Sequence, residues 1–145
     1  MRVHISLPTP DLASAEAFYT ALLGAPDKKR NDYLRFAPSD VPIVLSLQPG
    51  KPREQSSSEH FGLRLEDDTA LKARWQALRE AGVSVHIEGE TECCYAGMQR
   101  AWVTDPMGTS WEIYQVTNDA IGDLESATCC VPKVDTAPST GGCCA

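Results

Sequence analysis

The sequence contains one short pattern twice, and this repeat limits the possible folds more than any other feature. "HISLPTPD" at residues 4–11 and "HFGLRLED" at residues 60–67 both read His-x-x-Leu-x-x-x-Asp. An amphipathic segment follows each copy and ends at a glycine, Gly24 in the first half and Gly82 in the second. The repeat therefore predicts two similar modules that pack against each other.

Each copy predicts a strand, a helix and then further strands. The apolar residues of the first helix fall within 12–23, after start signals at Thr9 and Pro10, and those of the second fall within 71–81. The strand-like runs that follow are "YLRFA" and "PIVLSLQ" in the first half, and "VSVHIE", "RAWVTD" and "WEIYQV" in the second. One early strand of the first half is poorly marked. We therefore expect an α+β fold of two βαβββ modules.

Composition divides the chain into two modules and a tail. We expect a single domain over residues 1–118, with module one at 1–50, a linker at 49–59 and module two at 59–118. Hydrophobic periodicity then stops, and the segment 119–145 ends in "PKVDTAPSTGGCCA". This composition is typical of a flexible C-terminal tail.

Three polar residues lie on predicted strands, on the face opposite the helices. In "RVHISL" the apolar residues alternate and send His4 to that face; "EHFGLRL" does the same for His60, and "WEIYQV" for Glu112. If the two sheets curl around a common cavity, all three side chains can line it. Two imidazoles and one carboxylate suit an octahedral Fe(II) ion with open positions, although Zn²⁺ accepts the same set. His86 has no counterpart in the repeat and is interpreted as structural.

The charge balance argues against polyanionic partners. The chain has 145 residues, a net charge of -7 and a sequence pI near 4.9. Such a protein would be repelled by a nucleic-acid backbone or an anionic membrane surface. Because neither a signal peptide nor a membrane-length apolar segment is visible, we expect a soluble cytoplasmic protein that acts on small molecules, as a monomer or homodimer.

All six cysteines occur as adjacent pairs. One pair is Cys93 and Cys94 in "TECCYA", and the tail contains the other two. An apolar content of 42% is sufficient for an ordinary core, so a disulfide scaffold is not needed and reduced thiols are expected. Adjacent side chains converge only where the backbone turns, which favours a loop for each pair.

These motifs together resemble the vicinal oxygen chelate superfamily, which includes glyoxalases, extradiol dioxygenases and fosfomycin-resistance thiol transferases. The resemblance covers about residues 1–117 and depends on the paired modules, the two histidines and "TDPMGTSWEIY". Within the superfamily, "TECCYA" followed by "RAWVTDP" and "WEIY" is similar to the organoarsenical carbon-arsenic lyases. Superfamily members with four metal ligands take the additional one from a strand late in the first module. The matching strand here, "PIVLSLQ", offers only apolar residues, Ser46 and a terminal Gln48. This suits a metal site with open positions and counts against glyoxalase chemistry.

The resemblance implies a function and its residues. The family's metal ligands fall on His4, His60 and Glu112, and its substrate-binding cysteines fall on Cys93 and Cys94. The implied activity is an Fe(II)- and O2-dependent dioxygenase reaction that cleaves the carbon-arsenic bond of methylarsenite and trivalent aromatic arsenicals, giving arsenite for detoxification. Two alternatives remain: a non-catalytic arsenic- or cadmium-binding protein of this fold, and a fosfomycin-type thiol transferase.

The adjacent thiols match the valence of such a substrate. Methylarsenite has one carbon and two exchangeable hydroxides, so two protein thiols can hold the arsenic and leave the carbon-arsenic bond free. Glycines on both sides of the pair, Gly89 and Gly97, favour a mobile loop that carries arsenic toward the metal. The tail pairs, Cys129 with Cys130 and Cys143 with Cys144, are candidate accessory sites for capturing arsenicals.

Overall fold

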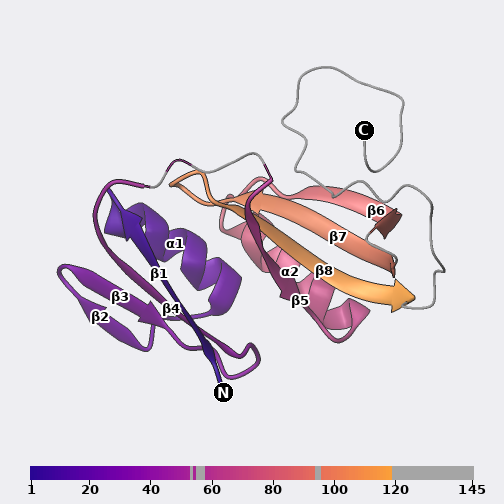
Figure 1. The fold of residues 1–145 in the computed structure, drawn as a ribbon, viewed down its shortest axis with the longest axis horizontal. Helices are drawn as coiled ribbons and strands as arrows, with labels where there is room; N and C mark the ends of the chain where they lie inside the picture. Colours follow the sequence, from indigo (N-terminus) through magenta and orange to yellow (C-terminus); the bar gives the residue numbers. More distant parts are fainter. Residues whose placement is uncertain (53, 55–57, 94–95, 119–145) are drawn as a thin grey trace.

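The described part of the chain forms two four-stranded sheets, each covered on one side by a single helix (Figure 1). The computed structural model describes residues 1–52, 54, 58–93 and 96–118, with the backbone alone for 90–93 and 96. The predicted fold class is confirmed, since both halves have the element order βαβββ. The tail pairs Cys129–Cys130 and Cys143–Cys144 lie outside the described residues.

The first sheet has the strand order β1-β4-β3-β2 and the second has the equivalent order β5-β8-β7-β6. In each sheet the first and last strands of the module pair in parallel, and the other strands pair antiparallel. The strands of the first sheet are β1 (Val3–Thr9), β2 (Lys28–Arg30), β3 (Tyr33–Phe36) and β4 (Ile43–Pro49). Those of the second are β5 (His60–Arg64), β6 (His86–Cys93), β7 (Ala96–Thr104) and β8 (Ser110–Asn118). The poorly marked early strand is β2, a short edge strand of three charged residues.

Both helices form where the apolar periodicity predicts them, and an aspartate caps the N-terminus of each. Helix α1 (Leu12–Leu23) is capped by Asp11, whose carboxylate accepts hydrogen bonds from the backbone N–H groups of residues 13 and 14. Helix α2 (Asp68–Glu80) is capped in the same way by Asp67. The start signal assigned to Thr9 was wrong by two residues because its hydroxyl accepts from the Asp11 N–H in the turn before the helix.

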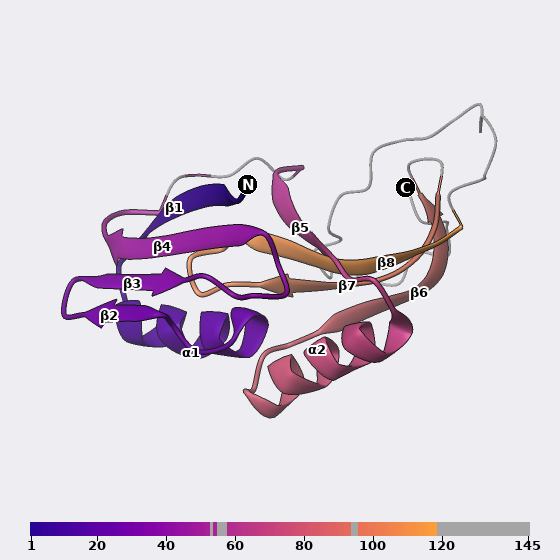
Figure 2. The same cartoon turned by 90° about the horizontal axis from the view of Figure 1, so that it is seen from below.

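The two modules share one apolar core. Both helices lie on the same side of the sheets (Figure 2) and contact each other. Tyr19 of α1 reaches the second module, where its hydroxyl donates to Asp105 Oδ2 at 2.6 Å and accepts from Trp111 Nε1 at 3.2 Å. Burial and the Asp105 carboxylate raise the pKa of Tyr19, so its proton stays in place. These contacts link the two modules.

The cysteine-bearing segment differs from the expectation of a loop. Strand β6 continues from His86 through Gly89 to Cys93, and residues 90–93 pair with residues 96–99 of β7. An irregularity in register lies between Glu88 and Glu90, at the glycine. The prediction of a loop between Gly89 and Gly97 was therefore wrong for residues 90–93, while Cys94 lies outside the described residues. Polar "EGETE" has no apolar alternation, and the strand forms through pairing with β7.

No helix in the described part of the chain has both the length and the apolar character needed to cross a membrane.

Candidate functional site

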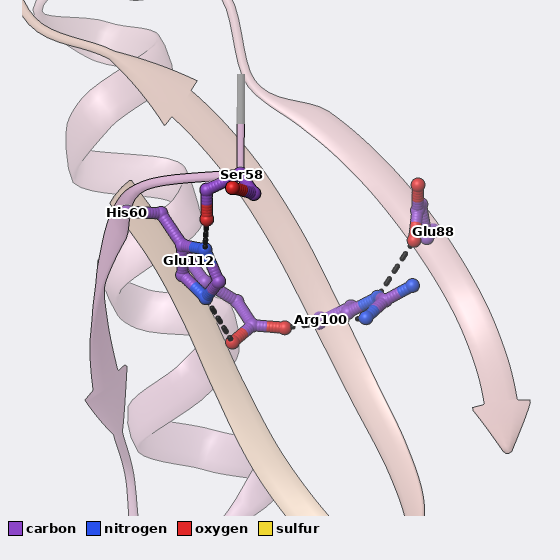
Figure 3. Close-up of polar contacts among 5 residues, drawn as sticks. All are labelled: Ser58, His60, Glu88, Arg100 and Glu112. Atoms are coloured by element: carbon purple, nitrogen blue, oxygen red, sulfur yellow. Dashed lines mark hydrogen bonds and ion pairs between the residues drawn. The ribbon is translucent and has the colours of Figure 1, made fainter. Parts of the chain in front are cut away.

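The sheet face away from α2 carries a cluster of polar side chains from β5, β6, β7 and β8 (Figure 3). Alternation along the strands produces this face, because Trp111 and Ile113 of β8 point into the core and send Glu112 to the other side. In the sheet register Glu112 lies beside Gly62 on β5 and Trp102 on β7. The cluster therefore belongs to module two.

His60, the first residue of β5, is oriented by the backbone before it. Its Nδ1 lies 3.1 Å from the carbonyl oxygen of Ser58, and its ring packs edge-on against Trp102 with centroids 5.0 Å apart. A carbonyl oxygen can only accept, so Nδ1 carries the proton in this contact. In the neutral ring Nε2 then has a free lone pair, the arrangement usual for a histidine that binds a metal ion.

Glu112 faces this lone pair. Its Oε2 lies 3.8 Å from His60 Nε2, which is longer than a hydrogen bond. Its Oε1 accepts from Arg100 Nη1 at 3.4 Å. Burial raises the pKa of Glu112, and the positive charge of Arg100 opposes that rise. Two electron-pair donors that face each other across this distance fit a divalent cation between them.

Gly62 provides space beside this carboxylate. A Cβ atom at residue 62 would lie 3.1 Å from Tyr114 Cε1 and 3.7 Å from Glu112 Oε2. The missing side chain thus lets the tyrosine ring lie over β5. A larger residue would push the ring aside and crowd Glu112.

His4, the third predicted ligand, lies on the other sheet. Its Nε2 is 3.1 Å from Ser46 Oγ on β4. Within the described ranges, no three side chains of His, Cys, Asp or Glu come close enough together to hold one metal ion. The structure thus brings His60 and Glu112 together and leaves His4 apart, so the three-residue ligand set stays a prediction.

The two predicted thiol ligands are only partly described. Cys93 is the last residue of β6 and is paired in register with Ala96 of β7, so its backbone belongs to the same sheet as His60 and Glu112. Its side chain and Cys94 lie outside what the structure describes. His86, interpreted as structural, is exposed at the other end of β6.

Sequence reasoning missed Arg100 and assigned no role to Trp102. Arg100 is 1% exposed and bonds to both Glu88 and Glu112. The indole Nε1 of Trp102 is buried and has no hydrogen-bond partner among the described residues. The signal was present in "MQRAWVT". Ala101 and Val103 point into the core, so alternation sends Arg100 to the opposite face, which carries the cluster.

A cleft of about 390 Å³ runs between the adjoining edges of the two modules. Its walls are mainly apolar, and Gly62 forms part of them. Apolar residues of both modules line it, among them Val3, Ile5, Phe61, Leu63 and Trp111. A small organic group can therefore be accommodated at the seam between the modules.

Comparison with known proteins identifies a family and several relatives that are similar to this chain. Residues 2–113 match the family described as the Glyoxalase/Bleomycin resistance protein/Dioxygenase superfamily. The chain is 35% identical over 135 residues to a trivalent organoarsenical cleaving enzyme of Thermomonospora curvata, with 91% of this chain and 89% of the relative covered. It is 32% identical over 145 residues to a cadmium-induced protein of Mycobacterium tuberculosis, with 92% and 95% covered.

Among solved structures, the fold is similar to a glyoxalase/bleomycin resistance protein/dioxygenase from Alicyclobacillus acidocaldarius. The TM-score is 0.66 at 20% identity, over 82% of this chain and 93% of that one. This likeness concerns the fold alone. The family match and the relatives at 35% and 32% identity confirm the resemblance seen in the sequence, and the chain belongs to the glyoxalase, bleomycin resistance protein and dioxygenase superfamily.

Proposed function

We propose that this protein cleaves the carbon-arsenic bond of trivalent organoarsenicals, with methylarsenite and trivalent aromatic arsenicals as substrates and arsenite as the product. The observation that carries the proposal is the pair His60 Nε2 and Glu112 Oε2, 3.8 Å apart, on the sheet whose strand β6 ends at Cys93. A relative with 35% identity is named a trivalent organoarsenical cleaving enzyme, which supports the choice of substrate. The reaction would serve arsenic detoxification in the cytoplasm.

The donor atoms fit Fe(II). His60 and Glu112 would hold the ion, and His4 is the proposed third ligand, completing the two-histidine, one-carboxylate set used by non-haem iron oxygenases. For His4 to contribute, its Nε2 would have to leave Ser46 Oγ and the two module edges would have to approach each other. Bound Fe(II) would supply the redox chemistry that activates dioxygen.

The residues of the chain itself bind and orient the substrate in this proposal. Cys93 and Cys94 would exchange with the two hydroxides of methylarsenite, releasing water and leaving the methyl group unattached to the protein. The buried indole N–H of Trp102, which lacks a partner among the described residues, is available to an acceptor atom of a bound molecule beside His60. The apolar cleft at the module seam would take the organic group of a larger arsenical.

A direct experiment tests this function. The protein is loaded anaerobically with Fe(II), mixed with methylarsenite and then exposed to air, while arsenic speciation and dioxygen uptake are followed. We expect arsenite to accumulate only when iron, dioxygen and enzyme are all present. Iron-loaded protein that forms no arsenite would disprove the proposal.

The second candidate is a protein of this fold that binds arsenic or cadmium without turnover. The relative at 32% identity named a cadmium-induced protein favours it. The same experiment separates the two, because a binding protein would deplete free methylarsenite without consuming dioxygen.

The tail cysteines lead to a further prediction. Removing residues 119–145 should raise the KM for methylarsenite several-fold and leave kcat unchanged, because tethered thiols raise the local concentration of bound arsenical. Initial rates at low and at saturating substrate measure the two effects.

The control for this truncation is a full-length protein with serine at Cys129, Cys130, Cys143 and Cys144. It should behave like the truncated chain. Normal KM values in both proteins would mean that the tail thiols do not capture substrate.

A further inference from the structure

Arg100 is a buried cation at the centre of the polar cluster. Its side chain is 2% exposed, and the Cζ atom lies 5.7 Å from the centre of the Trp102 ring. A guanidinium does not lose its proton in proteins, so a buried one must be compensated by negative charge. Among the residues that the structure describes, Glu88 and Glu112 on the neighbouring strands contribute to this compensation.

The two glutamates take different positions around the guanidinium (Figure 3). Glu88, opposite Arg100 in the β6–β7 register, accepts from Nε at 2.6 Å. Glu112 on β8 lies at the other side and accepts from Nη1 at 3.4 Å. Because the guanidinium is planar and rigid, the short bond to Glu88 sets the direction in which Nη1 points.

This geometry makes the two oxygens of Glu112 unequal. Oε1 lies next to Arg100, and Oε2 lies next to His60 Nε2. An N–H group on a carboxylate oxygen competes with a cation for that oxygen, so Oε2 is the atom that Glu112 can offer to an ion.

We infer that Arg100 is a positioning residue that withholds Oε1 of Glu112 and presents Oε2 alone to the metal ion. The inference rests on the proposed function, since it concerns the same ion. A carboxylate restricted to one oxygen occupies one coordination position instead of two. More positions then stay open for small molecules, which the proposed dioxygen chemistry requires.

A purely structural role for Arg100 makes different predictions. If Arg100 only stabilised the sheet, its loss would lower the melting temperature and leave the number of metal ligands unchanged. If Arg100 restricts Glu112, its loss frees Oε1 to bind the ion. Metal affinity should then hold or rise, because a competing positive charge is removed, while turnover falls.

The test uses Arg100→Gln and, because that change leaves Glu88 without its guanidinium, the double variant Arg100→Gln with Glu88→Gln. Mn(II) serves as the probe, and water-proton relaxation counts its exchangeable waters. A six-coordinate ion held by three single-atom ligands should keep about three waters in the unmodified protein and about one fewer in both variants. Mn(II) affinity should be equal or higher, and turnover after iron loading should fall about 10- to 100-fold.

Arg74→Gln is the matched control. Arg74 of α2 also donates to a carboxylate, that of Asp40, and to the carbonyl oxygen of Leu22. This variant should lose stability and keep the water count of the unmodified protein.

An unchanged water count in the folded Arg100 variants, or weaker Mn(II) binding in them, would overturn the inference and leave the proposed function standing. Failure of the unmodified protein to bind either Mn(II) or Fe(II) would instead overturn the proposed function, and this inference with it.

Discussion

Replacing Cys93 or Cys94 with serine is expected to reduce kcat/KM for methylarsenite by about 100- to 10,000-fold. The reason is the loss of chelation, because a second bond from the same protein raises the strength of attachment by that range over a single bond. Trivalent arsenic exchanges hydroxide for thiol, and a serine hydroxyl gives no comparable gain. Steady-state kinetics, together with direct binding of methylarsenite to iron-free protein, measure the loss.

The tail cysteines provide the control for this prediction. Cys129→Ser with Cys130→Ser removes an equally close pair of thiols, but the expected change is confined to KM and is several-fold. If Cys93→Ser and Cys94→Ser both turned over methylarsenite normally, the adjacent thiols would not be the substrate ligands. If each cysteine variant lost methylarsenite binding but kept iron binding, the thiol pair and the metal site would be shown to bind their ligands independently.

The sequence predicted the elements well where the signal is local. The repeated His-x-x-Leu-x-x-x-Asp pattern, the apolar periodicity of each helix and the glycines that end them gave two βαβββ modules in the observed order. Local signals also account for the turn at "DPMG" before the last strand, where Pro and Gly are typical turn residues. Gly108 has a φ of 89°, and the Asp105 carboxylate accepts from the N–H groups of Met107 and Thr109.

Strand alternation predicted correctly which side chains face away from the helices, but it could not predict their distances. His60 and Glu112 meet because β5 and β8 are paired neighbours within one sheet. His4 belongs to the other sheet, whose position depends on contacts between modules. Those contacts, such as Tyr19 with Asp105 and Arg74 with Leu22, join residues more than 50 positions apart and have no local signature.

Arg100 was missed for a related reason. A charged residue in a strand usually indicates a solvated face. Its burial depends on neighbouring strands, which contribute the carboxylates of Glu88 and Glu112. The alternation within β7 indicates the face on which Arg100 lies, but it does not indicate which carboxylates that side chain will meet.

Loss of His60 or Glu112 should have the largest effect on metal binding. We expect His60→Ala and Glu112→Gln to lower both Fe(II) affinity and turnover by more than about 100-fold, the upper end of the cost of losing an outer-shell partner of a metal site. His60 Nε2 and Glu112 Oε2 face each other 3.8 Å apart; His60→Ala removes the first donor, and Glu112→Gln replaces the carboxylate with a neutral amide. Equilibrium dialysis of Fe(II) under nitrogen measures the affinity without depending on turnover.

His86→Ala is the matched control, because His86 is a histidine of the same sheet, exposed and outside the cluster. It should bind Fe(II) like the unmodified protein.

His4→Ala then decides whether the modules must approach each other. If His4 is the third ligand, its loss should weaken Fe(II) binding as strongly as the loss of His60, because either change leaves the ion with two protein ligands instead of three. Full Fe(II) affinity in His4→Ala would show that the site lies within module two, with the role of His4 limited to its contact with Ser46. Full affinity in His60→Ala would contradict the metal site itself.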